Sequence, residues 1–364
     1  MYDVAIIGAG INGCALVYEL RNTKKSVVIF DAKGIAAGGS GAAGAFISPK
    51  FSKAGLLKKL LHEAFLYSLP FYEEHFGHLL TKAQLLHLAK DADDVAVLKA
   101  YKENSPLELL DVPNESREYV SIDAGLVDAK RVCEAMAKFA HFIQEQVESL
   151  RYDDGVWVIN ETYSAKEVVL ATGAYEQLIQ EPYVSLRGIW GHRIDVRTTT
   201  QNPLSIHQFV SIAPSKDGVV AIGATHNVHY HPQTTKEPYD IASGREELLQ
   251  KAARTIELEN VAVIKDYTGL RSGSFDYIPI IGPLVMAEET LRNRDINFTK
   301  KAQNYEAYSY YPNLYMINGS GGYGFVFAPY LAKALAEHIV SAKAINKELL
   351  PARFFARWAR KLKS

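Results

Sequence analysis

The sequence predicts an α/β fold in which a parallel sheet with covering helices is interrupted by an inserted antiparallel sheet. Residues 4–7, 27–30 and 168–171 are short, wholly apolar runs rich in β-branched residues, which suits buried parallel strands. Residues 14–21, between the first two runs, have the apolar spacing of a helix. From about residue 183 to 283 short strands alternate with turns, which indicates an antiparallel sheet.

The first 31 residues combine a strand, a glycine turn, a helix, a second strand and an acid. Gly8, Gly10 and Gly13 follow the first strand, and Asp31 ends the second strand eighteen residues past Gly13. In such a unit the glycines permit a tight turn, approach of a pyrophosphate and close helix packing, while the acid binds a ribose diol. The unit predicts a Rossmann-like dinucleotide-binding domain. The alternative is an α/β unit with an incidental glycine turn.

Two further glycine segments extend this prediction. Residues 38–45 are all Gly, Ala or Ser, so they cannot build a core and suit a loop against a flat ligand. A flavin enzyme needs such a second segment, because its larger cofactor runs past the first turn, whereas a nicotinamide enzyme does not. The alternative is a flexible surface loop. Residues 319–324 form a third glycine turn, which predicts an anion or flavin-edge site, and the Ala-Thr-Gly turn at 171–173 also brings backbone close to a ligand.

The remaining elements follow from spacing and capping residues. We expect a helix within residues 55–80 that Pro70 interrupts or ends. Residues 84–120 are expected to form a solvated, mixed segment of a second domain. Asp128 is a candidate N-cap for a helix from 129 to about 141, followed by a β-meander. Two later helices are expected at 245–257 and at about 328–345.

Composition narrows the class of protein. A net charge of −1 and 48% hydrophobic residues fit a globular protein and give no overall field that favours nucleic acid or membrane. Two cysteines support neither a disulfide framework nor a metal cluster, so we expect a reducing cytoplasm. No stretch suits a signal peptide or a membrane span. His226, His229 and His231 leave a metal site open, although a loop of exposed histidines is preferred.

These motifs resemble the D-amino-acid oxidase and glycine oxidase family of flavoproteins. The resemblance is carried by residues 8–31, the 171–173 turn, Gly269-Leu270-Arg271 and the last glycine turn. Within that family the chain looks most like the FAD-dependent oxidase half of the bifunctional tRNA 5-methylaminomethyl-2-thiouridine biosynthesis proteins, through residues 38–53. The chain departs from the family in having small residues at 42–44 and Tyr323 where an arginine is usual.

The resemblance implies noncovalently bound FAD and a two-part architecture, with no metal. The residues expected around FAD are Gly8, Ala9, Gly10, Ile11, Asn12, Gly13, Asp31, Ala32, Gly39, Ser40, Gly44, Ala45, Val147, Ala171, Thr172, Gly173, Gly319, Gly321, Gly322, Tyr323 and Gly324. The FAD-binding domain is expected to comprise residues 1–80, 130–182 and 310–345. The substrate domain is expected to comprise residues 81–129 and 183–309.

Family chemistry removes a hydride from the carbon next to an amine and delivers it to the flavin, and the resulting imine is split by water. Such chemistry needs orientation rather than a protein nucleophile. Arg271 is the candidate anchor for a substrate carboxylate, with Tyr323 at the flavin edge. The alternative for Arg271 is an ion pair with Asp276 or another acid.

The resemblance leaves two substrates open. The first is the carboxymethylaminomethyl group of a tRNA wobble uridine, converted to aminomethyl with release of glyoxylate. The second is a free amino acid such as glycine, sarcosine or a D-amino acid, acted on by an oxidase or dehydrogenase. A flavin-binding module without catalysis is a third reading. The absence of a methyltransferase half suggests a separate methyltransferase partner.

The C-terminal segment, residues 346–364, is expected to form a basic helix. From residue 343 onward there are seven Lys or Arg residues and one acid, and aromatic residues recur at rough helical spacing. Three roles are open for it: contact with tRNA phosphates, attachment to an anionic membrane, or docking of its aromatic side on the body of the protein.

Overall fold

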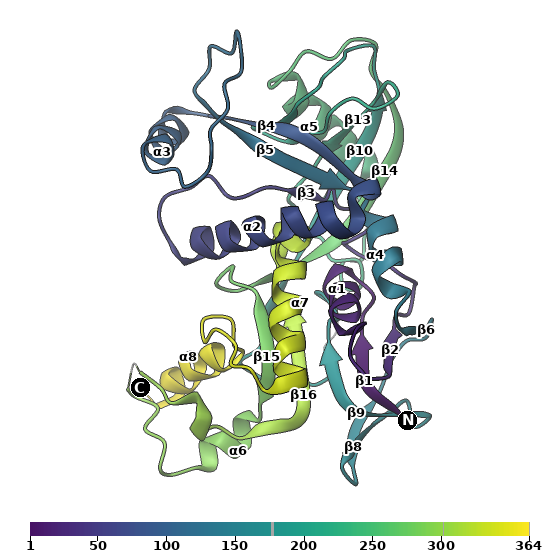
Figure 1. Ribbon diagram of the computed structural model, residues 1–364, viewed down its shortest axis with the longest axis vertical. Coiled ribbons are helices and arrows are strands. Elements are labelled where there is room, and N and C mark those ends of the chain that lie inside the picture. Colours follow the sequence, from purple (N-terminus) through teal and green to yellow (C-terminus); the bar gives the residue numbers. More distant parts are fainter. Residues whose placement is uncertain (176–177, 301, 364) are drawn as a thin grey trace.

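The computed structural model describes residues 1–175, 178–300 and 302–363. Its described part contains two eight-stranded sheets, confirming the expected α/β class. In Figure 1 the second sheet occupies the upper half, the first sheet occupies the lower half, and the long helix α2 (Leu56–Phe76) crosses between them.

The first sheet has the order β15-β16-β9-β1-β2-β6, with the β7-β8 hairpin attached to β9. The strands from β16 to β6 are parallel, whereas β15 is antiparallel to β16. Its strands are β1 (Tyr2–Ile7), β2 (Val27–Phe30), β6 (His141–Ile143), β7 (Leu150–Asp153), β8 (Val156–Ile159), β9 (Tyr163–Leu170), β15 (Ile280–Val285) and β16 (Tyr310–Asn318). The predicted parallel strands and the β-meander through β9 are confirmed.

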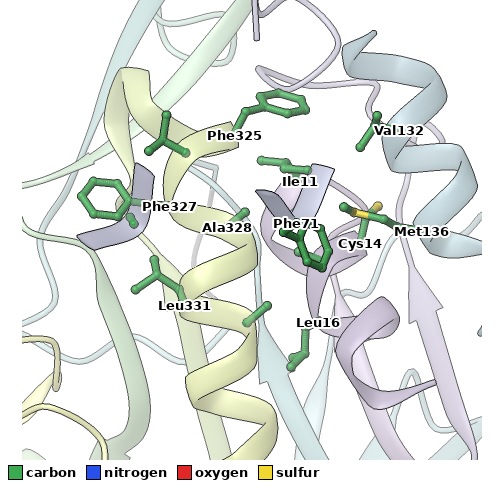
Figure 2. Packing of buried hydrophobic residues seen from close by; sticks show 14 of the residues in the cluster. Ile11, Cys14, Leu16, Phe71, Val132, Met136, Phe325, Phe327, Ala328 and Leu331 are labelled. Atoms are coloured by element: carbon green, nitrogen blue, oxygen red, sulfur yellow. The ribbon is translucent and has the colours of Figure 1, made fainter. Parts of the chain in front are cut away.

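Helices cover one face of this sheet through a continuous apolar core. Figure 2 shows residues of α1 (Ile11–Leu20) between α7 (Gly324–Ser341) and α4 (Ala129–Ala137), with Cys14 beside Met136. Both cysteines, Cys14 and Cys133, are buried as free thiols. The predicted N-cap of α4 is confirmed, because the Asp128 side chain accepts a hydrogen bond from the Arg131 amide at 3.1 Å.

Several expected boundaries were wrong. Pro70 lies inside α2 and does not end it. The Ser68 and Tyr72 hydroxyls donate to carbonyls of α7 at 2.7 and 2.9 Å, so packing against α7 outweighs the backbone bond lost at proline. The helix expected from residue 328 begins at Gly324. The helix expected at 245–257 is α5 (Ile241–Ala253), because Asp240 caps it earlier.

Residues 84–120, expected to be a solvated, mixed segment of a second domain, contribute regular elements to the second sheet. It contains most of β4 (Leu80–Leu88), all of α3 (Ala92–Glu103) and the start of β5 (Tyr119–Val127). The other strands of this sheet are β3 (Phe46–Ile47), β10 (Leu186–Arg197), β11 (Ser205–His207), β12 (Ser211–Ile212), β13 (Val219–Gly223) and β14 (Ala262–Ser274). All neighbours pair antiparallel except β4 and β11.

Sheet membership differs from the expected domain limits in two places. β15 lies within the expected substrate segment 183–309, yet it pairs with β16 of the first sheet. Five of its six residues are buried: Ile281 packs in the core that contains α1, and Ile280, Leu284 and Val285 pack in a second core on the opposite face of the sheet. Residues of α6 (Ala287–Arg292) and the short helix η2 (Tyr305–Ala307) join the same core. Conversely, β3 comes from the expected FAD-binding segment and pairs with β5.

The basic C-terminal segment forms α8 (Ala352–Lys363) and docks its aromatic side on the first sheet. Phe355 is fully buried, with ring centroids 4.9 Å from Tyr308 and 5.5 Å from Tyr183. Arg353 pairs with Asp276 at 3.1 Å and donates to the Ile278 carbonyl at 2.7 Å. Of the three open roles, docking is therefore observed. Ser364 lies outside the described residues, and among those described no helix is long and apolar enough to cross a membrane.

We expect Phe355→Ala to lower the free energy of unfolding by about 3–5 kcal/mol, because it leaves a cavity between α8 and the first sheet. Leu362→Ala is the control, since Leu362 lies on the same helix and is 56% exposed. Its expected change is within about 0.5 kcal/mol. Urea unfolding measures both variants, and equal small changes would contradict the docking of α8.

Candidate functional site

The site is a cavity of about 1460 Å³ that lies between the carboxyl ends of the parallel strands and the second sheet. Segments that follow β1, β2, β6, β9 and β16 all contribute to its lining. This is the place where open parallel sheets bind their ligands. All residues expected around FAD line this cavity except Ala9, Gly13 and Gly319.

The first glycine turn is built by close backbone packing. Gly8 has φ +111°, and a Cβ on Gly13 would overlap the Gly8 carbonyl oxygen, so Gly13 serves helix packing rather than lining. The Asp31 carboxylate accepts hydrogen bonds from the amides of Ala9 and Lys33, each at 2.9 Å, and is thereby fixed at the cavity wall. The N-cap of α1 is Gly10, and Gly10, Ile11 and Asn12 line the cavity, so the positive end of this helix faces it.

The second glycine segment packs against the second sheet. A Cβ on Gly39 would lie 2.5 Å from the Leu270 carbonyl oxygen, and one on Gly269 would lie 2.9 Å from the Gly39 Cα. Ser40 reaches back to the first turn, where its hydroxyl accepts a hydrogen bond from the Ile11 amide at 2.9 Å. This loop therefore joins the two sheets at the cavity and is not a detached surface loop.

Asn318 links the turn at residues 171–173 to the glycine turn at residues 319–324, a role that the sequence did not predict. Its side-chain amide donates to the Gly173 carbonyl at 2.9 Å and its oxygen accepts from the Gly319 amide at 2.8 Å. Asn318 is 1% exposed and lines the cavity. A polar residue at the end of the apolar run 314–317 was the available signal.

The residues of this region fit FAD. The cavity is lined by an acid suited to a ribose, by a helix N-terminus suited to a pyrophosphate, and by three glycine-containing turns. The Thr172 hydroxyl lines the cavity and is buried without a hydrogen-bond partner among the described residues, so it is available to a bound group.

Arg271 lies in the part of the cavity formed by the second sheet. Its guanidinium donates to the Thr225 carbonyl at 3.2 Å and lies so close to Gly191 that a Cβ there would overlap it. Among the described residues it has no carboxylate within ion-pair distance, and Asp276, its suggested partner, binds Arg353 instead. Burial lowers the pKa of Arg271.

Tyr323 also lines the cavity, at the start of α7. It is half-buried, and burial raises the pKa of its hydroxyl. The three histidines considered for a metal lie in the loop after β13, where His226 and His229 are exposed. No metal-binding group of three His, Cys, Asp or Glu residues occurs in the described part of the chain.

Comparison with known proteins decides the family. The DAO family model, described as FAD dependent oxidoreductase, matches residues 3–338. The chain belongs to this family of FAD-dependent oxidoreductases. Membership makes the protein a flavoenzyme with FAD as its cofactor, as the glycine turns predicted.

Curated relatives include bifunctional tRNA 5-methylaminomethyl-2-thiouridine biosynthesis proteins, MnmC. The protein of Legionella pneumophila strain Lens is 25% identical over 96% of this chain and 56% of its own length. The protein of Campylobacter concisus is 24% identical over 98% of this chain and 60% of its own length. The chain thus spans rather more than half of these relatives.

Solved structures share the fold. Glycine oxidase from Geobacillus kaustophilus has a TM-score of 0.73 and 20% identity, with coverage of 94% of this chain and 95% of its own. L-Proline dehydrogenase from P. horikoshii also has a TM-score of 0.73, with 17% identity and 97% coverage of both chains.

We expect Gly10→Val to abolish FAD binding. A Cβ at this position would already lie 3.2 Å from the Ser40 hydroxyl, and the two methyl groups would fill the approach expected for the pyrophosphate. Gly77→Val is the control, since apart from the adjoining backbone no atom of the described residues lies within 4 Å of a Cβ there. FAD content per polypeptide and circular dichroism measure the effect. A folded Gly10→Val protein with wild-type FAD content would contradict the proposed pyrophosphate position.

Proposed function

We propose that this flavoenzyme oxidises a carboxylated secondary amine, specifically the carboxymethylaminomethyl group of a tRNA wobble uridine. The products are the aminomethyl uridine and glyoxylate. Arg271 is the observation that carries the assignment of a carboxylated amine, because it is a cavity-lining cation without a carboxylate partner among the described residues. A substrate that is an N-substituted glycine supplies the missing carboxylate.

The physical case for Arg271 rests on its surroundings. A guanidinium pairs with a carboxylate through two parallel hydrogen bonds, which fixes orientation as well as position. Thr225 is 1% exposed and its carbonyl holds one nitrogen of the guanidinium, leaving the remaining donors for a ligand. Gly191 gives the guanidinium room against β10. Arg271 is therefore preorganised to orient one end of a substrate.

In this proposal bound FAD supplies the acceptor for a hydride from the carbon between the carboxylate and the amine nitrogen. Loss of that hydride leaves an imine, to which water adds, and cleavage of the carbon–nitrogen bond releases glyoxylate and the primary amine. Arg271 holds the carboxylate so that this carbon faces the flavin side of the cavity. Tyr323, half-buried at the lining, helps to exclude water there.

Three observations support tRNA as the carrier of the amine. The curated relatives are named for tRNA modification. Lys50, Lys53 and Lys90 line the cavity, where they can meet phosphates. On α8 the exposed Arg357 lies over the ring of Phe275, which is 53% exposed, and such a pair suits stacking and phosphate contact. We place the reaction in the cytoplasm, where tRNA is modified.

The relatives carry further sequence beyond the part that this chain matches. Their bifunctional name leads us to propose that a methyltransferase acts next on the primary amine that this chain releases. The second candidate function is oxidation of a free amino acid. Arg271 favours it equally, because its donors suit the carboxylate of any small amino acid.

The two candidates differ in the preferred substrate. Under anaerobic conditions, tRNA carrying 5-carboxymethylaminomethyluridine should reduce the flavin at least tenfold more efficiently than glycine, sarcosine or D-alanine. The reason is that remote contacts to the larger substrate contribute to the transition state. Stopped-flow absorbance measures the rates, and unmodified tRNA is the control. Faster reduction by a free amino acid would instead establish the second candidate.

Arg271→Ala should lower kcat/KM for the preferred substrate, because a buried charge pair is lost. The expected loss of transition-state stabilisation is about 2–5 kcal/mol. Arg271→Lys should recover only part of the loss, since an ammonium cannot form the paired hydrogen bonds. Arg197→Ala is the matched control, because Arg197 is exposed on β10. FAD content should stay unchanged in all three variants. Wild-type kinetics in Arg271→Ala would assign Arg271 a structural role.

A further inference from the structure

A row of side chains crosses the second sheet at right angles to its strands and faces the cavity. We call Arg193, Gly223, Ser211, His207 and His87 the transverse row. Each is the register partner of the next, on β10, β13, β12, β11 and β4 respectively. Directly opposed residues on neighbouring strands project to the same face, and all five line the cavity.

The transverse row contains polar atoms that lack partners. His207 Nε2 and Arg193 Nε are buried and make no hydrogen bond within the described structure. Such atoms cost free energy unless something bonds to them, so they indicate a ligand. Gly223 makes room for the Arg193 side chain, because a Cβ on Gly223 would lie 2.8 Å from Arg193 Cγ.

Both histidines of the row are neutral at physiological pH. Burial lowers the pKa of His87 to about 4 and that of His207 to about 3. A neutral imidazole offers one donor and one acceptor, which together match a heterocyclic amide rather than an anion. Aromatic rings flank the pair: Phe46 lies 4.9 Å from His207 and Phe51 lies 5.0 Å from His87, between ring centroids. Both phenylalanines line the cavity and supply apolar surface for a flat ring.

The distance between Arg271 and His207 distinguishes the two candidate substrates. The Arg271 guanidinium lies over Gly191 on β10, and β11 is three strands further along the sheet. At about 4.8 Å per strand, His207 is about 14 Å away across the sheet. A free glycine bound at Arg271 cannot span this distance. A heterocycle that carries a carboxymethylaminomethyl chain is a longer ligand, and its ring can lie toward His207 while its carboxylate stays at Arg271.

We propose that the transverse row binds the uracil ring of the substrate, with His207 and His87 bonding its amide edge while Arg271 holds the carboxylate. The inference rests on the proposed function, because it assigns the base-binding part of the same site. It makes His207 a specificity-determining residue and gives the cavity two separable binding regions.

The test uses two partial ligands with the FAD-loaded protein. Uridine has the base without the carboxylate, and N-methylglycine has the carboxylate and amine without the base. Calorimetry under anaerobic conditions measures both dissociation constants. His207→Phe keeps a ring against Phe46. We expect it to raise the dissociation constant of uridine at least tenfold and that of N-methylglycine less than twofold. Arg271→Ala should show the reverse pattern.

His229→Phe is the matched control, because His229 is exposed in the loop after β13, and neither constant should change in it. Absence of uridine binding to the wild-type protein overturns the inference. Equal weakening of both ligands in His207→Phe also overturns it, since that pattern indicates a structural role. Failure of the proposed function is a different result: modified tRNA then fails to reduce the flavin, whatever uridine binding shows.

Discussion

Backbone packing at the first glycine turn is the constraint on which the rest of the site depends. A Cβ on Gly13 would overlap the Gly8 carbonyl oxygen, and one on Gly8 would overlap the Ala171 carbonyl oxygen. The absence of these carbons lets α1, β1 and the end of β9 meet without intervening side chains. Asp31, Thr172 and the start of α1 are thereby gathered at one edge of the sheet, where a pyrophosphate and ribose can be held.

The same kind of contact sets the second sheet against the first. Gly39 and Gly269 approach at the backbone, so the loop that borders the cofactor region also lies directly beside the strand that carries Arg271. Arg271 has no carboxylate within ion-pair distance among the described residues, and Asp276, the acid that the sequence suggested for it, pairs with Arg353 of α8. The C-terminal helix thus binds the connection between β14 and β15, of which Asp276 is the second residue.

Most of the cofactor region could be predicted from the sequence, because its signals are local. A glycine spacing, an apolar run and a terminal acid lie within 31 residues, and each reflects the conformation of its own segment. Pro70 shows the limit of such rules. Its local effect is to end a helix, yet hydrogen bonds from Ser68 and Tyr72 to α7 carry α2 through it. Those partners lie more than 250 residues away in the chain.

The sequence by itself determined the α/β class, the dinucleotide-binding turn, the flavin cofactor and Arg271 as the candidate anchor. Tertiary structure decided the placement of β15, the docking of α8, the link made by Asn318 and the alignment of the transverse row. His87 and His207 are 120 positions apart, and only the pairing of β4 with β11 brings them together. Pairing register between distant strands depends on the packing of whole faces, which no local pattern of residues records.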